Sequence, residues 1–136
     1  MLECEKVIIM GHVNPDIDAM GAALGIYRMA TSLRKDAFII TNNNSASIRS
    51  FVENIYEEYK EVLIDKETAL AKLDSETLLV IVDTHKKSYV EASELLNETN
   101  KIVVIEKKLQ ISEKLYSRKR IFCFESICNF LFLSPL

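Results

Sequence analysis

The sequence has little of what would place a protein outside the cell or in a membrane. Its only cysteines are Cys4, Cys123 and Cys128, at no zinc-like spacing. An odd, scattered set of this kind is typical of cytosolic thiols rather than of a disulfide framework. No apolar run approaches the roughly 18 residues of a membrane span, and residues 1–6 are too polar for a signal peptide. The sequence therefore predicts a cytoplasmic chain with no membrane contact of its own.

An excess of positive charge is also missing. The net charge is −3, so general electrostatics give no reason to bind extended nucleic acid or an anionic membrane. With 136 residues, the chain has the length of one domain. It is long enough to bury a core, but short for an enzyme that needs a separate substrate lobe. The sequence does not predict an oligomeric state.

The composition changes sharply after residue 106. Up to Glu106 there are 11 basic and 18 acidic residues, whereas the remainder has 6 basic and 2 acidic residues and four of the six phenylalanines. A shift of this kind marks a boundary. We therefore expect a domain at residues 1–106 and an atypical tail at residues 107–136, which packs poorly or forms a helix unrelated to the core.

Short runs that are apolar throughout alternate along the chain with stretches of helical spacing. This alternation is typical of an α/β fold, in which helices flank both faces of a parallel sheet. The expected strands are residues 6–10, 37–41, 77–83 and 101–105; the expected helices are residues 17–33, 45–60 and 89–96, with a short helix that ends near residue 73.

Polar side chains gather where these strands end. The carboxyl ends of parallel strands form one edge of a sheet, which is where functional groups collect. Carboxylates at one edge repel each other unless a cation lies between them, and carboxylate with imidazole suits a divalent metal such as manganese. The residues concerned are His12, Asp16 and Asp18 after the first strand, Asp83 and His85 after the third, and Glu106 after the fourth.

Each of these residues also has a simpler interpretation when taken alone. For a single aspartate at a helix start, such as Asp16 or Asp18, capping of the helix is the better explanation. His12 alone would more often be an ordinary loop histidine. Capping does not explain His12, a second aspartate two residues on, and Asp83 at another strand end, so the case for a metal site depends on the set.

Two segments resemble motifs of a known superfamily. Residues 11–25, GHVNPDIDAMGAALG, are similar to the first motif of the DHH superfamily, and residues 79–85, LVIVDTH, are similar to its second. The superfamily includes nucleases, small-oligonucleotide phosphatases and family II pyrophosphatases. The VDTH form of the second motif, followed by Tyr89, Val90 and Glu91, favours the branch of cyclic di-AMP phosphodiesterases, since a pyrophosphatase would have VDHN there.

The resemblance implies a role for each matching residue. His12 and Asp16 would bind one manganese ion, Asp18 a second, and Asp83 would bridge the two. His85 would help to position the site or the substrate, although a histidine packed at a strand end is an equally good interpretation. The resemblance implies cyclic di-AMP or another small nucleotide as the substrate and linear pApA as the product, but it assigns no substrate-binding residue.

The chain departs from the family after the fourth strand. The family has Asp-His-His there, whereas this chain has Glu106, Lys107 and Lys108. Glu106 keeps the negative charge, but a charged lysine has no lone pair with which to bind a metal. A later aspartate ligand and the DHHA1 domain of the family have no counterpart either. We therefore expect a truncated or frameshifted fragment, inactive alone, of a membrane-anchored phosphodiesterase whose catalytic domain is cytoplasmic.

Two other functions stay open at this point. The chain could be another DHH-family phosphoesterase, related to nanoRNases, 3′-phosphoadenosine-phosphate phosphatases or pyrophosphatases. It could instead be a remnant that binds a metal or a nucleotide without turnover.

Overall fold

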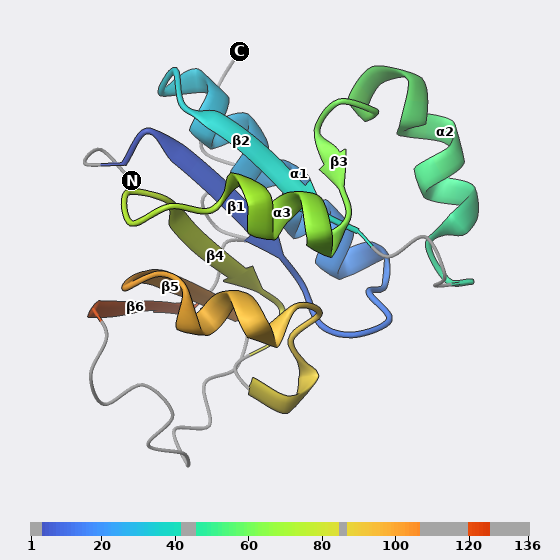
Figure 1. The fold of residues 1–136 in the computed structure, drawn as a ribbon. Coiled ribbons are helices and arrows are strands. Elements are labelled where there is room, and N and C mark those ends of the chain that lie inside the picture. Colours follow the sequence, from blue (N-terminus) through green and yellow to red (C-terminus); the bar gives the residue numbers. More distant parts are fainter. Residues whose placement is uncertain (1–3, 42–45, 85–86, 107–119, 126–136) are drawn as a thin grey trace.

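The structure, a computed structural model, describes residues 4–41, 46–84, 87–106 and 120–125 (Figure 1). Six strands form one sheet in the order β3-β2-β1-β4-β5-β6, and every neighbouring pair is parallel. The strands are β1 (Lys6–Met10), β2 (Asp36–Ile40), β3 (Leu63–Ile64), β4 (Leu78–Val82), β5 (Lys101–Glu106) and β6 (Arg120–Glu125); the helices are α1 (Ile17–Ser32), α2 (Arg49–Tyr59) and α3 (Lys66–Lys72), with two 3-10 turns, η1 (Lys87–Tyr89) and η2 (Ser93–Asn97).

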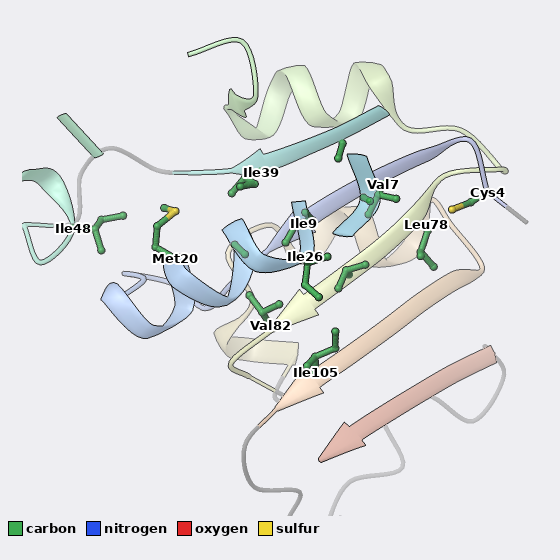
Figure 2. Packing of buried hydrophobic residues seen from close by; sticks show 14 of the residues in the cluster. Cys4, Val7, Ile9, Met20, Ile26, Ile39, Ile48, Leu78, Val82 and Ile105 are labelled. Carbon is green, nitrogen blue, oxygen red and sulfur yellow. The ribbon is translucent and has the colours of Figure 1, made fainter. Parts of the chain in front are cut away.

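Both faces of the sheet are covered. Successive side chains of a strand point to opposite faces, so Val7 and Ile9 of β1 pack with α1 and α2, while Ile8 and Met10 pack with α3 and η2. Figure 2 shows the first of these clusters, with Met20 and Ile26 of α1 set against the sheet. Burial on both faces explains why β4, and β1 after Lys6, are apolar throughout instead of alternating.

The sequence predicted most of these elements correctly. The four expected strands are confirmed as β1, β2, β4 and β5, and three of the four expected helices are confirmed as α1, α2 and α3. Strand β3 was not predicted, because two residues are too short to show a pattern. The helix predicted at residues 89–96 is wrong: Val90 forms an isolated antiparallel bridge with His12, which separates η1 from η2.

Part of the tail belongs to the sheet. β6 pairs with β5 over six residues, from Lys101 opposite Arg120 to Glu106 opposite Glu125. The prediction that the tail lies outside the sheet is therefore wrong for this segment. Composition marked a boundary there, but the sequence RIFCFE is rich in β-branched and aromatic residues, which favour a strand. That the tail comes from a shifted reading frame stays a prediction.

Within the described ranges, no helix is both long and apolar enough to cross a bilayer.

A polar cluster fastens the sheet at its amino-terminal edge. The Lys6 ammonium donates to the Asp74 carboxylate at 2.9 Å and to the Lys72 carbonyl at 2.6 Å. Asp74 also accepts from the Thr77 hydroxyl at 2.7 Å and from the Glu76 amide at 3.0 Å. Hydrogen bonding to Lys6, and then to Thr77, lowers the pKa of Asp74 from 3.8 to about 2. These contacts tie the start of β1 to the connection that leads into β4.

We expect Asp74→Asn to have a lower melting temperature than the unmodified chain at pH 7. The difference between the two melting temperatures should disappear in acid. A carboxyl group whose pKa is lowered by folding contributes stability above its unfolded pKa. For Asp74 this contribution is complete above about pH 4 and is lost as the pH falls through about 2. Thermal melts between pH 2 and pH 7 measure it. Glu57→Gln, at an exposed carboxylate 3.5 Å from Lys60, is the control, and a constant difference across this range would contradict the assignment.

We further expect deletion of residues 107–136 to destabilise the domain, because it removes β6 and leaves the β5 edge without its partner. The melting temperature should fall by about 5 °C or more. Deletion of residues 126–136 alone, which keeps β6, is the matched control. An unchanged or higher melting temperature after the longer deletion would show that residues 107–136 do not stabilise the domain.

Candidate metal centre

Three of the predicted ligands meet at the carboxyl edge of the sheet. β1 and β4 are neighbours, with Met10 opposite Ile81, so the residues that follow the two strands lie side by side. The His12 Nε2 atom is 3.6 Å from Asp83 Oδ2 and 3.9 Å from Asp16 Oδ2. One ligand atom of each residue lies within 4.8 Å of the others. A single cation can therefore reach all three side chains with small rotations.

The His12 imidazole is held in a form suited to metal binding. Its Nδ1 atom lies 2.9 Å from the Val13 carbonyl oxygen. Because that oxygen can only accept, Nδ1 is the donor of this bond, and Nε2 is the ring nitrogen that faces the two carboxylates. A hydrogen bond from the second ring nitrogen to a carbonyl is the usual way in which a ligand histidine is oriented.

Backbone hydrogen bonds hold the residues around His12 against a clamp formed by residues 89–91, far along the chain. The Val13 amide donates to the Tyr89 carbonyl at 2.6 Å, and the Glu91 amide donates to the Gly11 carbonyl at 3.1 Å. Val90, which lies between these bonds, is buried. Sequence reasoning missed this clamp and predicted a helix there, because no local pattern reveals a bridge between residues almost eighty positions apart.

Asp16 has two roles at once. It is the N-cap of α1, and its Oδ1 atom accepts from the Ala19 amide at 2.9 Å. Its other oxygen, Oδ2, faces His12. The capping interpretation of this aspartate is therefore correct, but it does not exclude metal binding, because each role uses a different oxygen atom.

Asp83 leaves β4 in an unusual backbone conformation. Its φ angle is 58°, in the left-handed region, which costs a residue with a side chain roughly 1–2 kcal/mol, with aspartate among the better tolerated. Its amide donates to the Ile105 carbonyl of β5 at 2.9 Å. The chain thus stays paired to the sheet up to Asp83 and turns away there, with the carboxylate one-third exposed.

The charge of the group fits a divalent cation. Two carboxylates and an imidazole form an oxygen and nitrogen ligand set that suits manganese, iron or zinc. The exposed fractions of the side chains are 22% for His12, 55% for Asp16 and 33% for Asp83. The group is therefore accessible to solvent.

Of the other predicted site residues, the structure describes the side chain of Asp18 only, and it is not part of this group. Asp18 lies exposed in the first turn of α1. Glu106 ends β5, and because Val82 is opposite Ile105, its backbone lies next to that of Asp83. His85, Lys107 and Lys108 fall outside the described residues, so their positions relative to the centre stay predictions.

Comparison with known proteins agrees with the resemblance. The family model described as "DHH family, N-terminal domain" matches residues 6–126. The chain is 44% identical over 108 residues to the cyclic-di-AMP phosphodiesterase GdpP of Bacillus subtilis (strain 168), and 33% identical over 109 residues to the cyclic-di-AMP phosphodiesterase PdeA of Listeria monocytogenes serotype 1/2a (strain 10403S). Each alignment covers 76% of this chain but only 16% of the relative.

A third relative has a lower identity to the chain. The chain is 30% identical over 105 residues, which is 72% of its length, to a membrane protein-large ribosomal subunit bL9 fusion protein of Onion yellows phytoplasma (strain OY-M), of which it covers 12%. The chain thus spans about a sixth or less of the curated relatives it matches. The family match also includes β6, beyond the boundary expected at residue 106. From these matches and the two motifs, we conclude that the chain belongs to the DHH family and carries its N-terminal domain.

Proposed function

We propose that this chain is part of a metal-dependent phosphodiesterase that hydrolyses cyclic di-AMP to pApA, and that it does not turn over substrate alone. The observation that carries this proposal is the convergence of His12, Asp16 and Asp83 at the edge of the sheet. The names of the two bacterial relatives support the cyclic dinucleotide as substrate, and the family places the reaction among phosphoester hydrolyses.

In this proposal, each side chain holds metal in a defined way. His12 Nε2 and Asp16 Oδ2 would bind one manganese ion, Asp83 would bridge to a second, and Asp18 would reach the second after a rotamer change. A pair of such ions supplies a deprotonated water and neutralises the charge of the phosphodiester. The protein's own contribution is to fix the spacing of the ligands, through the β1–β4 pairing and the clamp at residues 89–91.

Exposed apolar side chains close in the chain to the candidate ligands support an organic substrate over bare pyrophosphate. Val13 is 47% exposed, and Ile17 and Tyr89 are each 58% exposed. Val13 and Ile17 directly follow the ligands His12 and Asp16 in the chain, and Tyr89 is hydrogen-bonded to Val13. Exposed apolar and aromatic side chains next to a polar centre are typical of sites that bind a base or another ring.

The departures from the family motif support a lack of turnover. Lys107 and Lys108 stand where the family has two histidines, and a positive charge there opposes a second cation. The chain also covers only 16% of the two bacterial phosphodiesterases. A metal-binding remnant without turnover is therefore the second candidate. A cytoplasmic location belongs to the proposal as well.

We expect the chain to bind one manganese ion weakly. His12→Ala and Asp83→Asn should each weaken this binding at least tenfold, because each substitution removes a direct ligand. Loss of even a supporting group commonly lowers metal affinity tenfold or more. Isothermal titration calorimetry measures the affinity. Asp36→Asn removes an exposed carboxylate at the opposite end of the sheet and should leave the affinity unchanged. Equal binding by all four proteins would show that the centre is not the metal site.

We also expect no measurable release of pApA when the purified chain is incubated with manganese and cyclic di-AMP. Restoring the family motif through Glu106→Asp, Lys107→His and Lys108→His should not rescue turnover, because these 136 residues span only about a sixth of the phosphodiesterases that they resemble. Chromatography of the nucleotide products measures the reaction. Robust manganese-dependent release of pApA by the unmodified chain, abolished by Asp83→Ala, would contradict the proposed inactivity.

A further inference from the structure

Three residues other than glycine have left-handed backbone conformations in the described part of the chain. Asn14, Arg34 and Asp83 each have a φ angle of 58°. Such conformations cost free energy and persist only where the surrounding structure imposes them, and they are frequent at functional sites. Two of the three belong to the metal centre: Asp83 is one of its ligands, and Asn14 lies between the ligands His12 and Asp16.

Arg34 has a purely structural explanation. It follows the last turn of α1, where its amide donates to the Thr31 carbonyl at 2.9 Å and the Lys35 amide donates to the Ala30 carbonyl at 3.0 Å. A left-handed residue just after a helix is a common way to satisfy the last carbonyl groups. Its conformation is thus explained by the end of the helix.

Asn14 has no such explanation. It lies in the loop between β1 and α1, before Pro15, and proline disfavours compact conformations of the residue ahead of it. Its side chain is exposed, and no described residue hydrogen-bonds to it. The amide group therefore stabilises nothing that would account for the conformation, and the role of this residue must lie in its backbone.

The left-handed turn at Asn14 closes a tight loop. After leaving β1 at Met10, the chain must return so that Asp16 can begin α1 at the same edge of the sheet. The loop comes close to itself: a β-carbon placed on Gly11 would lie 4.0 Å from the Pro15 β-carbon and 3.5 Å from that of Ala19. This closure brings Asp16 Oδ2 to within 3.9 Å of His12 Nε2.

We infer that Asn14 is a positioning residue of the metal centre, whose left-handed backbone holds His12 and Asp16 within reach of one ion. The inference depends on the proposed metal-binding function. Asparagine suits this position because, after glycine, it tolerates the left-handed region better than most residues. A residue that does not tolerate the left-handed conformation lets the loop between β1 and α1 relax in the metal-free protein. Metal binding must then return the loop to the conformation that brings His12 and Asp16 together, and this cost lowers the apparent affinity.

The experiment compares manganese affinity with thermal stability in a series of variants. Asn14→Gly should bind manganese as the unmodified chain does. Asn14→Ala should bind about threefold to tenfold more weakly, and Asn14→Val more weakly still, because β-branched residues are the least compatible with this conformation. Calorimetry gives the affinity, and melts without metal give the stability.

Arg34→Val is the matched control, since it has the same φ angle at a position away from the centre. It should lower the melting temperature and leave the manganese affinity unchanged, whereas Asn14→Val should lower the affinity as well. Unchanged affinity in Asn14→Ala and Asn14→Val would overturn the inference while leaving the metal site intact. If Asn14→Gly and Asn14→Ala weaken manganese binding equally, the inference is overturned. The side-chain amide of Asn14, and not its backbone conformation, would then support metal binding. An unmodified chain that binds no manganese would overturn the metal site itself, and the inference with it.

Discussion

The parallel pairing of β1 with β4 is the constraint on which the rest of the molecule depends. It places Met10 opposite Ile81 at the centre of the sheet, and the two chain segments that carry His12 and Asp83 leave the sheet from adjacent points. Neighbouring strands lie about 4.8 Å apart, which is the scale of a metal ion with its ligands. A slip of one residue in either strand would turn its buried side chains to the wrong face, so the buried core protects the register that aligns the ligands.

The two edges of the sheet serve different purposes. At the amino-terminal edge, Lys6 and Asp74 form well-satisfied hydrogen bonds that tie β1 to the segment before β4. At the carboxyl edge, Asn14 and Asp83 adopt costly backbone conformations, and two carboxylates lie close to each other. A stable edge on one side of a rigid sheet allows the opposite edge to keep a strained and charged arrangement, which would otherwise relax.

The sequence predicted the features that depend on local pattern. Apolar strands, the start of α1 and the strand-end positions of His12, Asp16 and Asp83 all follow from periodicity and from the geometry of parallel sheets. It did not predict features that depend on distant partners. The bridge between His12 and Val90 replaces a helix because the backbone at residues 89–91 bonds to the loop after β1. Likewise, β6 forms because the edge of β5 offers it a partner, which the change in composition after residue 106 concealed.

The position of Asp16 at the start of α1 has an electrostatic consequence for the candidate metal centre. The amino-terminal end of a helix carries a partial positive charge, which disfavours a cation and favours an anion. Asp16 offsets that charge with one oxygen, while its other oxygen faces His12. The helix end alone would repel an ion in the proposed metal centre and would attract a phosphate group beside it. Asp16 therefore reduces an electrostatic cost that the end of α1 would otherwise impose on the proposed ion.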